Sequence, residues 1–205
     1  VKVKMTAVSN SGGMIIQHYH MAVHDARGCL YEGTTYFGFF SQAALADQVG
    51  IREAVRYQPT AQDLAANAPR PFPTDAPFPD DQWRMLDQVT VYAPNGGPSG
   101  LGFVQGTLKV RPDTWFFEAH FFEDPVCPGS LGLESFMQLL KFFAVERWGA
   151  NETTQFETLA LGEDHEWVYR GQIIPTDNEV TVEAVITSID DERKLLHADG
   201  FLIVD

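Results

Sequence analysis

The sequence predicts an α+β fold in which an antiparallel sheet wraps around one long buried helix. Long segments of strand-like composition occur toward both ends of the chain, and a helix with apolar residues on almost every side lies between them. The chain has 205 residues, of which 44% are apolar and 12% aromatic, and this is enough for one or two packed units.

The first 56 residues are predicted to contain a long hairpin. Residues 13–24 and 28–40 have the composition of two strands, and a tight connection joins them. Residues 41–56 follow as a short helix with its tail. Because no buried helix accompanies this hairpin, we expect residues 1–56 to be the closing half of a preceding, truncated unit.

Residues 57–81 are predicted to be a linker. Neither a helix nor a central strand tolerates the proline density of this stretch, which contains Pro59, Pro69, Pro71, Pro73, Pro77 and Pro79. The linker would separate the first segment from a complete unit at residues 82–205.

The buried helix is predicted to begin near Ser130 and to end at Gly149. Pro128 and Gly129 give a bend and an unhindered backbone N–H, and Ser130 is a good N-cap residue. From residue 131 to residue 148 the apolar side chains cover nearly every direction, so the helix must be buried on most sides. Gly149 then ends it.

A second long hairpin is predicted at residues 179–189 and 194–204. Moving the first hairpin forward by 166 positions places Met14 on Val180 and His24 on Asp190. We interpret this agreement as an internal repeat of low identity.

Residues 117–138 contain a candidate acid and base pair. His120 follows an aromatic run, and Glu134 lies about one turn inside the buried helix. A neutral imidazole is suited to remove a proton near neutral pH, and a carboxyl group can donate one. The backbone N–H of Gly129, at the start of the helix, is suited to stabilise a developing negative charge.

The stretch from His120 to Glu134 resembles the signature His-Phe-x-x-Asp-Pro-Val-x-Pro-Gly-x-Leu-Gly-Leu-[Asp/Glu] of bacterial 3-hydroxyacyl-acyl carrier protein dehydratases. It is especially similar to the dehydratase domains of bacterial polyunsaturated fatty acid synthases. The resemblance covers residues 82–205. Residues 85–89, 102–104 and 115–117 look like the opening strands of that family, and residues 169–176 and 198–200 look like its closing strands.

The resemblance implies a hotdog fold, in a double-hotdog arrangement, and a hydro-lyase with His120 as base and Glu134 as acid. Gly129 would supply the oxyanion N–H, and Val126, Pro128 and Ser130 would contact substrate. In that family the histidine of one unit meets the carboxylate of another, so a second unit or a second copy of the chain is expected. The acyl tunnel candidates, which are equally well explained as core residues, are Phe117, Phe121, Phe122 and Met137.

The same resemblance implies an acyl carrier protein partner and neither a metal nor a bound organic cofactor. Carrier proteins are acidic and this chain has a net charge of −14, so we expect tethering within one multienzyme, or a local basic patch at Lys141, Arg147 and Arg170. The same charge argues against nucleic acid. Neither a membrane span nor a secretory signal is visible, and a cytoplasmic location is expected.

Two other functions fit the same residues. A hotdog thioesterase would use a carboxylate to activate water or attack the thioester, and a non-catalytic hotdog would complete a partner's site or hold the carrier protein. Isomerisation to a 3-enoyl product would use the same acid and base. His18, His20 and His24 share a strand face but have no nearby carboxylate or cysteine, which favours a solvated face over a metal site.

Overall fold

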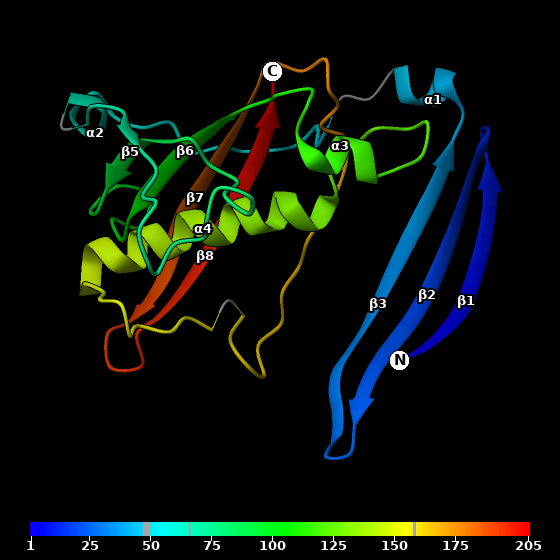
Figure 1. Ribbon diagram of the computed structural model, residues 1–205, viewed down its shortest axis with the longest axis horizontal. Coiled ribbons are helices and arrows are strands. Elements are labelled where there is room, and N and C mark those ends of the chain that lie inside the picture. The colour runs from blue at the N-terminus through cyan, green and yellow to red at the C-terminus, as the bar shows by residue number, and fades with distance from the viewer. Residues whose placement is uncertain (47–49, 66, 158) are drawn as a thin grey trace. The chain divides into compact units, whose positions relative to one another are not determined.

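The computed structural model describes residues 1–46, 50–65, 67–157 and 159–205. These residues form two compact units, Val1–Arg52 and Glu53–Asp205, and each unit has its own sheet (Figure 1).

The first unit is a three-stranded antiparallel sheet in the order β1-β2-β3, with strands Lys2–Ser11, Met14–Asp25 and Gly28–Phe40. The predicted hairpin is confirmed, because β2 and β3 pair antiparallel from Met14 opposite Phe40 to Asp25 opposite Gly28, with one shift of register after Val23. The short helix α1, Gln42–Ala46, follows. Residues 47–49 of the predicted helix tail lie outside the described residues.

The second unit is a hotdog, as predicted. Its five-stranded antiparallel sheet has the order β4-β5-β6-β7-β8. Helix α4, Gly129–Trp148, packs on β6, β7 and β8 and crosses them in Figure 1. The strands are β4 Arg70–Pro71, β5 Gln88–Ala93, β6 Phe103–Lys109, β7 Glu179–Asp190 and β8 Leu195–Val204, and the shorter helices are α2 Ala61–Ala65 and α3 Trp115–Ala119.

The core of the second unit lies between α4 and one face of the sheet. Successive strand residues point to opposite faces, so alternate residues of β7 face the helix. Val182, Ala184 and Ile186 are fully buried in this way, and Leu139 and Phe143 meet them from α4. The sheet thus covers one side of the apolar helix that the sequence predicted.

The opposite face of the sheet is covered by residues that precede the predicted second unit. Arg56 donates two hydrogen bonds of 2.7 Å to the carboxylate of Glu183, which is only 2% exposed. Tyr57 packs on Phe103, and Val185 packs against the same small cluster. A buried carboxylate requires such a partner, because an unpaired charge at this place would be costly.

Residues 57–81 are therefore not a free linker, and this prediction was wrong. Phe72 is 2% exposed inside the core and Phe78 packs against the same cluster. The prolines exclude a long helix or a central strand, but an extended chain still buries the aromatic side chains that lie between them. The structure divides the chain after Arg52 rather than after Arg56.

Four local predictions are also corrected. Residues 115–117 form the start of helix α3 rather than a strand, and residues 85–87 precede the first residue of β5. Residues 169–176 have no strand ladder within the part of the chain described here, although the carbonyl of Ile173 accepts a bond from Cys127 N–H. Helix α4 begins one residue before Ser130, and Pro128 rather than Ser130 is its N-cap.

Candidate active site

His120 is held at the end of helix α3 by its own backbone. Its N–H donates to Phe116 O over 2.9 Å, which closes the last turn, and its carbonyl accepts from Val126 N–H over 2.9 Å. Between them the backbones of Phe121 and Asp124 are bonded to each other in both directions. The loop that carries the histidine is thus tied at both ends.

The imidazole of His120 has a defined tautomer. Its Nδ1 lies 2.9 Å from Val126 O, and a carbonyl oxygen only accepts, so Nδ1 carries the proton. In the neutral ring Nε2 then holds a free lone pair. The side chain is half-buried, and the Phe121 ring lies against it with 3.6 Å between ring centroids. This arrangement presents Nε2 as a base.

Glu134 lies in the second turn of α4 and is half-buried. Its Oε1 accepts a hydrogen bond of 2.9 Å from Nε2 of Gln138, one turn further along. No hydrogen bond or ion pair joins Glu134 to His120 within the described residues. The two groups are therefore fixed separately, each by its own neighbour.

The first turn of α4 provides backbone N–H groups without partners. Within the described residues, no hydrogen bond uses the N–H of Gly129 or of Ser130, while Leu131 and Gly132 donate to Pro128 O. Such groups at the start of a 20-residue helix are suited to an anion. A Cβ at position 129 would overlap the ring of Tyr169, so glycine is required for this close approach.

The remaining predicted contact residues surround this turn. Val126 is buried, Pro128 is half-buried, and Ser130 is exposed. Cys127, between them, lines a cavity, and burial raises the pKa of its thiol to about 12. A thiol of this kind stays neutral at physiological pH, as expected of a small apolar side chain rather than a nucleophile.

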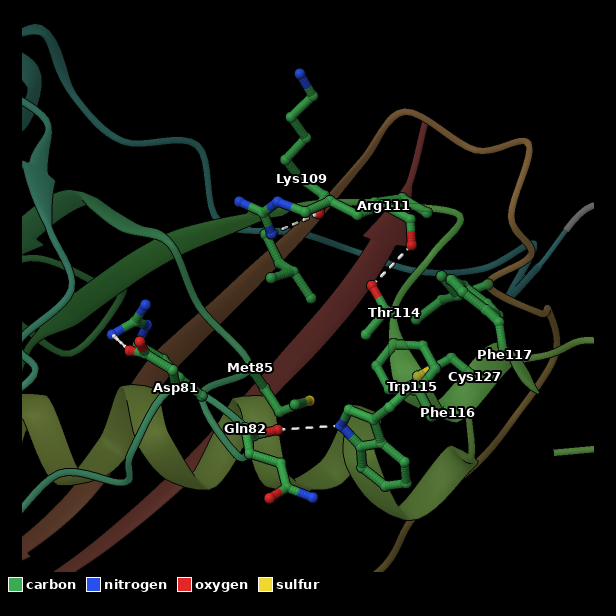
Figure 2. Close-up of a pocket in the computed structure, with 14 residues that line it drawn as sticks. Asp81, Gln82, Met85, Lys109, Arg111, Thr114, Trp115, Phe116, Phe117 and Cys127 are labelled. Atoms are coloured by element: carbon green, nitrogen blue, oxygen red, sulfur yellow. Dashed lines mark hydrogen bonds and ion pairs between the residues drawn. The ribbon is translucent and has the colours of Figure 1, made fainter. Parts of the chain in front are cut away.

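A cavity of about 200 Å³ lies behind the segment that carries the motif (Figure 2). Its apolar lining residues include Met85, Phe116, Phe117, Cys127 and Ile173. Three cationic residues also line it, namely Arg84, Lys109 and Arg111.

Of the four tunnel candidates, one lines the cavity and three do not. Phe117 lines the cavity, but Phe121 and Phe122 are 57% and 89% exposed, and Met137 packs on the core without lining this cavity. Exposed aromatic side chains in this loop do not enclose a tunnel within the described part of the second unit.

The sequence analysis missed Gln138 and Tyr169. Gln138 has a signal in the sequence, because residues four apart on a helix are neighbours, and Gln138 is four residues after Glu134. Tyr169 has none, since its contact with Gly129 joins segments forty residues apart.

The described residues include neither a metal-binding cluster nor a membrane-spanning helix. No group of three or more His, Cys, Asp or Glu is placed to hold a metal ion. None of the described helices is both long and apolar enough to cross a membrane.

Comparison with known proteins defines the class of the chain. A family model described as the FabA-like domain matches residues 78–205, which is more than half of the sequence. The chain therefore belongs to the FabA-like family.

A relative from Thraustochytrium sp. (strain ATCC 26185 / S-3), which is one of the subunits of a polyunsaturated fatty acid synthase, is 31% identical over 232 aligned residues. The alignment covers 98% of this chain, and the chain spans 15% of the length of that relative. The predicted resemblance to dehydratases related to polyunsaturated fatty acid synthases is thus confirmed.

Proposed function

We propose that this chain removes water from 3-hydroxyacyl thioesters carried on the phosphopantetheine of an acyl carrier protein, and forms the trans-2-enoyl thioester. The observation that carries the proposal is the bond from His120 Nδ1–H to Val126 O, because it leaves Nε2 of a neutral ring free to act as a base. Membership of the FabA-like family supports the reaction class.

In the proposed reaction Nε2 of His120 takes the proton from C2 of the substrate. The electron pair of that C–H bond forms the C2–C3 double bond as the C3–O bond breaks. Glu134, as the carboxylic acid, gives its proton to the departing hydroxyl, which leaves as water. Proton exchange with solvent then returns the imidazole and the carboxyl group to their starting states.

Negative charge develops on the thioester oxygen while the C2 proton leaves. The partnerless N–H groups at the start of α4, that of Gly129 first, are the donors proposed for this oxygen. One well-placed donor typically contributes about 3 kcal/mol to the transition state. The proposed steps use no metal and no organic cofactor.

A second hotdog unit completes the site in this proposal. The strand register of the first unit supports it, because Val3, Met5, Ile15, Phe37 and Phe39 all project from one face of the sheet. These side chains are between 41% and 62% exposed. A sheet with one apolar face needs another layer to cover it, and a hotdog half from the same or a second chain would supply one.

The carrier protein is proposed to be tethered in the same multienzyme rather than bound through a strong basic surface. Two of the predicted docking cations have internal partners in the structure. Arg147 is paired with Asp191 at 2.8 Å, and the Lys141 ammonium lies over the Phe156 ring. Tethering raises the effective concentration, so weak docking is sufficient.

Product analysis tests the proposal. The chain is incubated with a 3-hydroxyacyl-pantetheine thioester, and the products are separated and weighed by mass spectrometry. A trans-2-enoyl thioester is the expected product, and a 3-enoyl thioester in addition would show isomerisation. Free 3-hydroxy acid would instead support a thioesterase, and unchanged substrate would support a non-catalytic hotdog.

A further inference from the structure

Residues 82–85, here called the brace, contact both elements that carry the proposed acid and base. On one side, Trp115 Nε1, in the first residue of α3, donates to Gln82 O over 3.1 Å (Figure 2). On the other side, Gln138 of α4 donates from Nε2 to Trp83 O and accepts at Oε1 from Met85 N–H, both over 2.8 Å.

The brace leaves the amide of Gln138 only one orientation. Gln138 is 0% exposed, so water does not compensate for a lost bond. Turning the amide by half a turn would bring its NH₂ group against Met85 N–H and its oxygen against Trp83 O, and both bonds would be lost. In the orientation observed, the second N–H of Nε2 points to Glu134 Oε1 at 2.9 Å.

We propose that the brace is a positioning element that sets the orientation of Glu134 through Gln138. It also fixes the start of α3 through Trp115, and His120 is the C-cap of α3. Gln138 and Trp115 are thus positioning residues, since each acts through another group. This inference rests on the proposed function, because it takes His120 and Glu134 as the base and the acid.

A first experiment tests the geometry without any need for activity. In ¹H–¹⁵N NMR spectra of the whole chain, both Nε2 protons of Gln138 should exchange slowly with solvent. The substitution Glu134→Leu removes one acceptor, so protection of one of the two protons should be lost. Glu134→Gln keeps an acceptor and should preserve both. If Glu134→Leu removed the protection of both protons, or of neither, the result would contradict the proposed arrangement.

A second experiment measures the effect on dehydration. Gln138→Leu and Gln138→Glu remove the N–H donors. At this buried position the carboxyl group introduced by Gln138→Glu would be the neutral acid, which keeps an acceptor for Met85 N–H and can donate its O–H to Trp83 O, so that the variant can fold. Misplacement of a reacting group by about 1 Å can cost 10²-fold in rate, so kcat should fall 10- to 100-fold while KM changes less than about threefold. Ser135→Ala is the control, since Ser135 is also buried on α4 but bonds to Gly132 O.

Two tryptophans give a second matched pair. Trp115→Phe removes the Nε1–H that binds the brace, whereas Trp83→Phe removes an Nε1–H that has no partner among the described residues. Both rings are partly exposed and they pack edge to face at 5.3 Å. Trp115→Phe should lower kcat about tenfold at unchanged unfolding temperature, and Trp83→Phe should not.

The outcomes separate the two proposals. An inactive unmodified chain would overturn the proposed function, and the NMR result would still decide whether the brace orients Glu134. An active chain with equal kcat in the Gln138 variants and in Ser135→Ala would overturn the brace as a positioning element. Equal kcat in Trp115→Phe and Trp83→Phe would overturn its connection to α3.

Discussion

At the level of single residues, His120 and Glu134 are held by different kinds of neighbour. His120 donates to a backbone carbonyl, whereas Glu134 accepts from a buried side-chain amide. The sequence predicted both residues from their spacing in the motif. It did not predict the tautomer, because the position of Val126 O depends on a loop fold that short-range patterns do not specify.

Two substitutions at Glu134 distinguish an acid from a structural residue. Glu134→Gln keeps an acceptor for Gln138 but has no proton to donate, so kcat should fall by 10² or more. Glu134→Asp keeps the carboxyl group, so it should retain more activity than Glu134→Gln. Steady-state kinetics with a 3-hydroxyacyl thioester compares the two variants with the unmodified chain. If Glu134→Gln were as fast as the unmodified chain, Glu134 would not be the acid.

The two cysteines should differ sharply in reactivity. Cys29 is exposed, whereas burial raises the pKa of Cys127 to about 12. The thiolate is the reactive form, so at pH 8 we expect Cys127 to react at least ~100-fold more slowly with a disulfide reagent. The Cys29→Ser variant isolates the slow thiol, and urea should release it. Fast labelling of folded Cys29→Ser would contradict the raised pKa of Cys127.

At the scale of elements, helix α4 was predictable and helix α3 was not. The apolar residues of α4 cover so many directions that only a buried helix fits them, and Gly149 ends it with φ 75° as expected. The aromatic run of α3 has the composition of a strand. A local turn precedes the helix, because the Thr114 hydroxyl donates a hydrogen bond to Arg111 O. This turn favours a helix for the residues that follow.

The start of α4 offers a test of close packing. Gly129→Ala would place a methyl group where the Tyr169 ring lies. Because that ring is 48% exposed and can swing away, the loss of stability should be about 1 kcal/mol, at the low end for an overpacked site. Activity should fall further, since the ring or the first turn must shift.

A double-mutant cycle checks this explanation. The variant Gly129→Ala with Tyr169→Ala relieves the overlap, so its two changes should be non-additive by about 0.5 kcal/mol or more in chemical denaturation. Strict additivity of the two free-energy changes would mean that the methyl group and the ring do not meet.

At the scale of the whole molecule, the sequence located both hairpins and the hotdog but placed the boundary of the second unit too late. Proline density correctly excluded regular structure for most of residues 57–81, yet it says nothing about tertiary packing. Phe72 fills the core and Arg56 pairs with Glu183, and both contacts join segments distant in sequence. Such contacts are set by the folded sheet and not by local composition.

The boundary can be tested with two fragments. Residues 53–205 keep Arg56 and Phe72 and should fold cooperatively. Residues 82–205 leave Glu183 without its partner and a cavity in place of Phe72, and removal of a buried phenylalanine alone typically costs about 3–5 kcal/mol. Circular dichroism during heating compares them, and equal unfolding temperatures would restore the linker interpretation.

The most direct test of the account as a whole is the rate at which the chain and its His120→Ala variant form a trans-2-enoyl thioester from a 3-hydroxyacyl-pantetheine thioester. Circular dichroism of both proteins first establishes that the variant is folded. We expect the chain to form the enoyl product, and we expect His120→Ala to lower kcat by about 10² to 10⁴, the usual contribution of a positioned base. A folded variant with an unchanged rate would contradict His120 as the base.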